Sequence, residues 1–244
     1  MTLAFPLNTN TRDTALTTSM AALYVALSYL PGFPVIGVEG ATVGILSGVV
    51  PVFGFVLGPW LGTSSVFVGG VVRRVLTGAS VYSWLLLPAT PLSALAAGCL
   101  SRRRIGVARG WMIAGLVLGG LIIAWYLTWI GQAVWIFPLL HWTGLAVIII
   151  FGEWLALFFQ RGEGIELMVC VGLCGFVANM VAQMYGTLVF IGAAEVGVIG
   201  ISLSPPFFAA LVPIFAVERL IFTAITTVVG VPVVLALRTR FPMS

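Results

Sequence analysis

Charged residues are scarce in this chain. Only 7% of its 244 residues are Asp, Glu, Lys or Arg, whereas 61% are hydrophobic and the mean hydropathy is +1.18. Soluble domains carry about 25% charged residues, so this composition excludes an ordinary soluble domain and indicates a polytopic membrane protein. Lysine is absent, and the net charge of +4 therefore comes from arginine. In a membrane protein such a balance is typical of cytoplasmic anchoring rather than of nucleic-acid binding.

Motifs for catalysis and for metal or cofactor binding are also missing from this sequence. We find no Walker motif, no HExxH, no GxSxG and no paired-carboxylate spacing. The three cysteines lie in apolar runs, which is typical of packing rather than of metal binding. We therefore expect no enzymatic activity, no metal and no cofactor. Any ATP-driven step would have to come from other subunits.

Two uncharged runs are too long for single membrane passes. The first, Gly40–Val72, has 33 residues and would span about 50 Å as one helix, against a hydrocarbon core of roughly 30 Å. The chain must turn within it, and Gly58–Pro59 is the predicted place because proline disfavours helix in the residue before it. The second run, 110–152, has 43 residues, with Gly131 and Pro138 marking its break.

These breaks predict an all-α transmembrane helix bundle that forms a single domain over 1–244. Residues 1–13 are a polar leader, and the first helix lacks a small-residue cleavage site, so we expect it to be retained. The expected helices cover about 14–30, 42–57, 60–77, 83–100, 110–130, 138–160, 165–190 and 207–237.

Eight passes place both termini on one side of the membrane. Eight of the eleven arginines then fall on that side, which identifies it as the cytoplasmic side. The exceptions are Arg73 and Arg74, which lie at an outer end, and Arg219, which lies inside the last helix.

A few polar residues lie inside the expected helices. Glu218 and Arg219 are about a third of the way into the last one, where a charge costs about 2.5–3.5 kcal/mol unless it faces protein, water or a partner. They indicate either a structural ion pair, for example of Glu218 with Arg73–Arg74, or a ligand-facing group. Asn179 and Gln183, four residues apart, share a helix face. They either bond neighbouring helices or line a site.

The aromatic residues near 125–142 and two further polar residues leave alternatives open. The tryptophans there are typical of an interfacial belt, or could stack on a planar ring. His141, the single histidine, is interpreted as a hydrogen-bonding surface residue, and Glu153 as a helix–helix contact or a proton relay.

Three segments resemble one family of membrane proteins. They are TSMAALYVALSYL (18–30), PVFGFVLGPWLGTSSVFVGG (51–70) and PIFAVERLIFTAITTVVGVPVVLALR (213–238). Together they resemble the substrate-binding S component of energy-coupling factor (ECF) transporters. That family usually has six helices, so the pair at 110–160 looks like an insertion.

The resemblance implies function and partners. An AxxxA pattern on the first helix, here Ala22 and Ala26, faces a transmembrane coupling subunit in that family, and two ATPase subunits drive transport. The first outer loop lids a vitamin site, and 31–41 stands in its position. The implied function is capture of a vitamin or related small nutrient from outside the cell. The alternatives are a stand-alone secondary transporter, or an intramembrane enzyme that uses His141 with Glu153 or Glu218.

We predict a substrate site in the outer half of the bundle, between loop 31–41 and the helices at 60–77, 165–190 and 207–237. Such a site would be mostly apolar with a few convergent polar groups. The candidate substrate-binding residues are Phe33, Glu39, Trp60, Arg73, Arg74, Asn179, Gln183 and Glu218.

Overall fold

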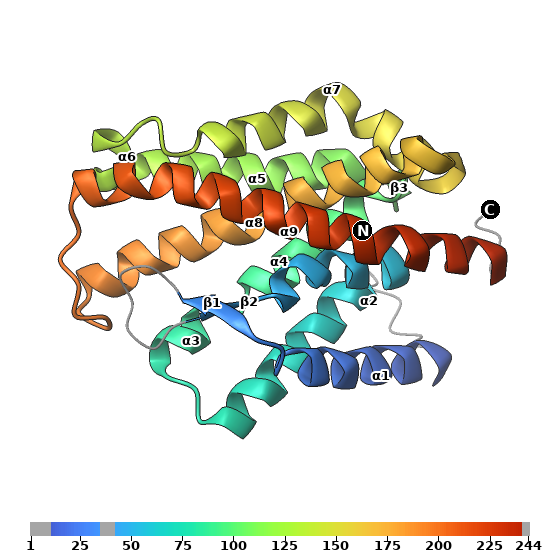
Figure 1. Cartoon of the computed structure of the whole chain (residues 1–244), viewed down its shortest axis with the longest axis horizontal. Helices are drawn as coiled ribbons and strands as arrows, with labels where there is room; N and C mark the ends of the chain where they lie inside the picture. The colour runs from blue at the N-terminus through green and yellow to red at the C-terminus, as the bar shows by residue number, and fades with distance from the viewer. Residues whose placement is uncertain (1–10, 35–41, 241–244) are drawn as a thin grey trace, which may run out of the picture.

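The computed structural model describes residues 11–34 and 42–240, and in this part the chain is a bundle of α-helices (Figure 1). The helices are α1 (Thr11–Leu27), α2 (Leu46–Thr77), α3 (Val81–Leu85), α4 (Ala89–Leu100), α5 (Gly110–Leu127), α6 (Trp129–Ala133), α7 (Leu139–Arg161), α8 (Gly164–Glu195) and α9 (Pro205–Arg240). Two short antiparallel hairpins pair β1 (Gly32–Pro34) with β2 (Thr42–Gly44) and β3 (Arg104–Ile105) with β4 (Ala108–Arg109). The predicted all-α bundle is confirmed.

Six helical segments of the described residues are long and apolar enough to cross a membrane. They are Leu46–Thr77, Val81–Leu100, Gly110–Leu127, Leu139–Arg161, Gly164–Glu195 and Pro205–Thr239. The helix α1, with 17 residues, is shorter than the roughly 20 residues of a typical span. The chain is thus a multi-pass helical membrane protein.

The helix α2 reverses at Gly58–Pro59, as the uncharged run predicts. Gly58 has φ 79° and ψ −177°, a backbone conformation that favours glycine. A Cβ on Gly62 would lie 2.7 Å from the carbonyl oxygen of Phe53, although nine residues of continuous helix would separate the two by about 13 Å. The two arms of α2 therefore pack against each other.

Other expected boundaries shift. The helix expected at 83–100 is divided between α3 and α4, with Pro88 as the residue that caps α4. The helix expected at 110–130 ends at Leu127, and Gly131 lies inside the short helix α6. The side chain of Thr128 begins α6 by accepting a hydrogen bond from the backbone N–H of Gly131.

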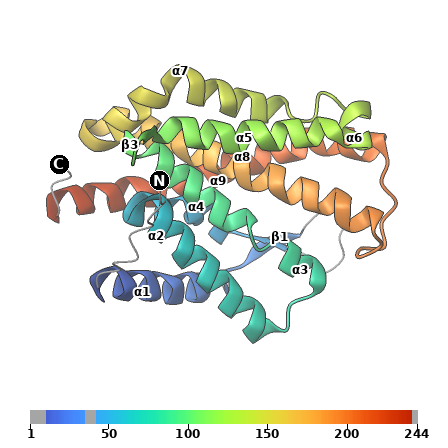
Figure 2. The ribbon, with the colours of Figure 1, turned by 180° about the vertical axis from the view of Figure 1, so that it is seen from behind.

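The helices α5 and α7 share the main core of the bundle. Leu118, Ile148 and Leu155 are fully buried, in one cluster with Cys174 of α8. Figures 1 and 2 show α5 and α7 along one side of the bundle and α1 along the other, with α4, α8 and α9 between them. The segment expected as an insertion is thus built into the same core as α8.

One end of the bundle gathers most of the arginines, and we call it the arginine-rich end. It includes the turn at Gly58, which lies beside the guanidinium of Arg102, and the β3–β4 hairpin. Arg238 of α9 donates to the carbonyl oxygens of Phe158 and Gly162 at 3.1 and 2.5 Å, and so caps α7 there. The beginning of α1 and the end of α9 point the same way (Figure 1).

The contact of α2 with α4 depends on glycine. A Cβ on Gly54 would overlap the carbonyl oxygen of Ala94 and would lie 2.7 Å from the backbone nitrogen of Gly98, so a backbone would have to shift. We expect Gly54→Ala to destabilise the protein by about 1–3 kcal/mol, the range for overpacking. Gly120→Ala is the matched control, because a Cβ there meets nothing within 4 Å. Thermal unfolding of the purified variants measures both, and equal midpoints would contradict the close packing of α2 on α4.

Candidate functional site

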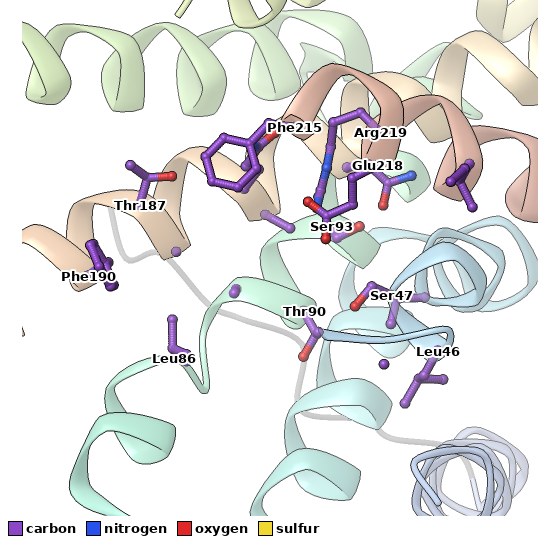
Figure 3. A pocket seen from close by; sticks show the side chains of 18 of the residues that line it. Leu46, Ser47, Leu86, Thr90, Ser93, Thr187, Phe190, Phe215, Glu218 and Arg219 are labelled. Carbon is purple, nitrogen blue, oxygen red and sulfur yellow. The ribbon is translucent and has the colours of Figure 1, made fainter. Parts of the chain in front are cut away.

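A cavity of about 770 Å³ lies between α2, α4, α8 and α9, with α1 at its edge (Figure 3). Its lining uses the second half of α8 and the first half of α9, so it occupies the half of the bundle away from the arginine-rich end. Sites for drug-sized ligands commonly measure about 300–1,000 Å³. The cavity is therefore large enough for a small organic molecule.

One face of α8 forms a wall of the cavity. Gln183, Gly186 and Thr187 lie four, seven and eight residues after Asn179, which places all four on one side of the helix. Asn179 is only 1% exposed, and neither its Nδ2 nor the Oε1 of Gln183 has a hydrogen-bond partner within the described residues. Gly186 leaves space, since a Cβ there would meet only Leu86, at 3.7 Å. This wall offers an unused donor and an unused acceptor.

The helix α9 contributes an ion pair. Nη2 of Arg219 lies 2.7 Å from Oε2 of Glu218, and the guanidinium also lies over the ring of Phe222, 4.8 Å from its centroid. Figure 3 shows Glu218 and Arg219 on the same helix beside the cavity. The suggested pairing of Glu218 with Arg73 or Arg74 is wrong, because its carboxylate binds the adjacent arginine instead.

The end of α2 brings two more arginines to the cavity. Arg74 is buried and donates from Nε to the carbonyl oxygen of Ser83 at 2.7 Å and from Nη1 to that of Gly70 at 3.1 Å. Arg73 also lines the cavity, and its buried Nε has no partner in the described part of the chain. Both side chains thus place positive charge in the wall.

Several polar groups of α1 and α4 also line the cavity, and the sequence analysis does not predict them. The hydroxyl groups of Tyr24 and Thr90 lie 3.2 Å apart, and the buried Oγ of Ser93 has no partner among the described residues. Thr90 and Ser93 are three residues apart, which puts them on one helix face. That spacing was a visible signal of a polar wall.

Aromatic rings close the cavity on its apolar side. Phe190, Phe208 and Phe215 line it, and Phe137 packs behind Phe208 and Phe215 with ring centroids 5.8 Å away from each. His141 stacks near Phe137 and is only 2% exposed, so its interpretation as a surface residue is wrong.

The tryptophans near this end divide into two groups. Trp129, Trp135 and Trp142 are exposed, as an interfacial belt requires. Trp125 is fully buried and stacks on Phe137 with centroids 4.3 Å apart, so it belongs to the core.

Other predicted site residues lie elsewhere or outside the described part. Trp60 is 60% exposed and does not line the cavity, because the reversal at Gly58–Pro59 puts it at the opposite end of its arm from Arg73 and Arg74. Phe33 pairs with Val43 between β1 and β2, but its side chain lies outside the described residues.

The two remaining predictions concern the loop and α1. Glu39 lies in 35–41, which falls outside the described residues. Ala22 and Ala26 are on the exposed side of α1, whereas the buried Ala21 and Tyr24 face α2.

Glu153 lies far from the cavity, at the arginine-rich end. Its carboxylate accepts from Arg109 at 2.9 Å, from Arg103 at 3.4 Å and from the indole N–H of Trp111 at 3.1 Å. His141 is on the same helix twelve residues earlier, a rise of about 18 Å. The two side chains therefore do not share a site.

The comparisons with known proteins supply no function. No family model matches the chain, and no solved structure matches it. An uncharacterised protein of Methanocaldococcus jannaschii is 26% identical over 176 residues, which are 71% of this chain and 54% of that protein. The chain thus spans about half the length of this curated relative. The fold and the cavity define a multi-pass helical membrane protein with an internal cavity.

Proposed function

We propose that this chain is the membrane-embedded substrate-binding subunit of an ECF-type importer, and that it captures a vitamin or related small nutrient from outside the cell. The observation that carries the proposal is the cavity of about 770 Å³, whose walls hold buried polar atoms without partners. Such atoms are costly to bury unsatisfied, and a bound ligand supplies what they lack. The binding residues proposed within the described part are Arg73, Arg74, Asn179, Gln183 and Glu218.

The proposed topology follows from the distribution of arginine. The arginine-rich end is assigned to the cytoplasm of a prokaryotic plasma membrane, since positive residues accumulate on that side. If α1, the two arms of α2 and the five following long segments each cross the bilayer, both termini are cytoplasmic. The cavity then lies in the outer half, where a nutrient arrives.

Partners are proposed from the resemblance and from the exposed side of α1. Ala22 and Ala26 leave a smooth strip there, on which a transmembrane coupling subunit is proposed to dock. Two ATPase subunits would supply energy, because the chain has no nucleotide-binding motif of its own. A stand-alone carrier is the second possibility, and neighbouring genes for ATPases and a coupling protein would decide between the two.

Replacing Asn179 by leucine tests the binding role. Leucine has a similar volume and no polar atoms, so it removes one contact with the ligand without leaving an unsatisfied group. We expect a small organic compound to co-purify with the wild-type protein, and we expect its affinity to fall about tenfold in this variant, which corresponds to about 1.4 kcal/mol. Calorimetric titration of that compound into ligand-free protein measures the change.

A structural role for Asn179 would give a different pattern. The ligand-free variant is expected to unfold at the same temperature as the wild type or higher, because the amide Nδ2 has no partner to lose. Unchanged affinity together with a lower unfolding temperature would contradict the proposed role of Asn179 in binding.

A further inference from the structure

The three arginines that line the cavity differ in how they are neutralised. Arg219 is paired with Glu218 at 2.7 Å. Arg74 donates to the backbone carbonyl oxygens of Gly70 and Ser83, which accept two of its hydrogen bonds without cancelling its charge. The Nε of Arg73 has no partner in the described residues.

The charge of the cavity wall is therefore positive. Glu218 is the sole carboxylate among the described residues of the lining, and Arg219 neutralises it. Arg73 and Arg74 are adjacent in the sequence and add two further positive charges. An arginine without a counter-ion is costly inside a membrane protein, and a bound anion offsets that cost.

Other lining residues of the cavity suit a different part of a ligand. Phe190, Phe208 and Phe215 supply apolar rings, and beside them Asn179 and Gln183 offer a donor and an acceptor. A molecule that fits all of these groups has an apolar body, a polar edge and an anionic group that reaches Arg73.

We propose that the ligand is an organic anion, with a carboxylate or phosphate group bound at Arg73 and an apolar body against the phenylalanines. This inference rests on the proposed function, since it names the class of substrate for the same cavity. A water-soluble nutrient and the head group of an anionic lipid share this chemistry, and the experiment separates them.

The test uses three probes with one ring system and different charges, namely naphthoate, naphthamide and naphthylmethylammonium. Each is titrated into the full-length, ligand-free protein in a neutral detergent. We expect naphthoate to bind at least tenfold more tightly than the amide, and the ammonium compound to bind weakest. Arg73→Gln should bring the ratio of naphthoate to naphthamide affinity close to one, and Arg73→Lys should preserve the preference.

Arg103→Gln is the matched control for a change of net charge. Arg103 is exposed and contacts Glu153 at the arginine-rich end, far from the cavity, so this variant should keep the wild-type preference. A loss of preference in Arg103→Gln as large as in Arg73→Gln would overturn the assignment of Arg73.

A second arm identifies the source of the anion. The protein is placed in nanodiscs of phosphatidylcholine alone or with added phosphatidylglycerol, and naphthoate binding is measured in both. Strong competition by phosphatidylglycerol assigns the site to a lipid head group. Equal binding in both nanodiscs assigns it to a soluble anion, and each result keeps the anionic class.

The remaining outcomes are also decisive. Amide or ammonium binding as tight as that of naphthoate would overturn the inference but leave the proposed function standing. If no probe binds, the compound extracted from the purified protein decides. An anionic compound that Arg73→Gln fails to retain supports the inference, and a neutral or cationic one overturns it. If nothing binds and nothing is extracted, the proposed function fails as well.

Discussion

Replacing Arg219 by methionine is expected to destabilise the protein by about 3–5 kcal/mol, the range for breaking a buried ion pair from one side. Arg219 is 6% exposed, and its side chain is the partner that the structure gives to Glu218, at 2.7 Å. Without it, Glu218 loses the one ion-pair partner that the described residues give it, in a largely buried position. At about 2–4 °C per kcal/mol for a chain of this size, the midpoint of thermal unfolding should fall by roughly 10 °C.

The double variant Glu218→Gln, Arg219→Met is the control for this prediction. It removes both charges together, so the unfolding midpoint should recover most of the loss. A double variant that is less stable than Arg219→Met alone would show that the pair is not the source of the effect. The loss of stability would then come from removing the contact of the Arg219 guanidinium with the ring of Phe222.

Filling the cavity should abolish binding. Gly186 faces the cavity from α8, and a side chain there enters open space beside Leu86. We expect Gly186→Trp to reduce the affinity for the co-purified compound at least a hundredfold, because the indole would occupy the volume that the ligand needs. Titration of the compound into purified protein measures this loss.

Gly120→Trp is the matched control for bulk. Gly120 is exposed on α5, where a Cβ meets nothing within 4 Å, so a tryptophan there should leave binding unchanged. Wild-type affinity in Gly186→Trp would place the binding site outside this cavity, for example beneath the tryptophans near α6.

Those parts of the fold could be predicted that depend on the length of an uncharged run or on the conformation of one or two residues. The run Gly40–Val72 is too long for one pass, and Gly58–Pro59 is the point in it that best accommodates a reversal. The common face of Asn179 and Gln183 follows from a spacing of four residues on a helix. These are local rules, and they hold in the structure.

The site was harder to predict because its parts meet only through the packing of distant helices. Tyr24 and Thr90 are 66 positions apart in the sequence, and no periodic pattern links them. The aromatic character of Trp60 suggests a site residue. The reversal at Gly58–Pro59, however, places Trp60 at the other end of the bundle from the cavity.

The partner of Glu218 was missed for a different reason. Neighbouring residues on a helix point about 100° apart, so the sequence favoured a distant arginine as the partner. The long side chain of Arg219 reaches back to its neighbour instead.

Native mass spectrometry of the full-length protein, purified in neutral detergent, shows directly whether the cavity holds a ligand. We expect wild-type protein with one small organic compound bound per chain, the same compound in Gly120→Trp, and bare chain in Gly186→Trp. Wild-type protein that carries no compound, or a Gly186→Trp variant that retains it in full, would contradict a ligand site in the cavity between α2, α4, α8 and α9.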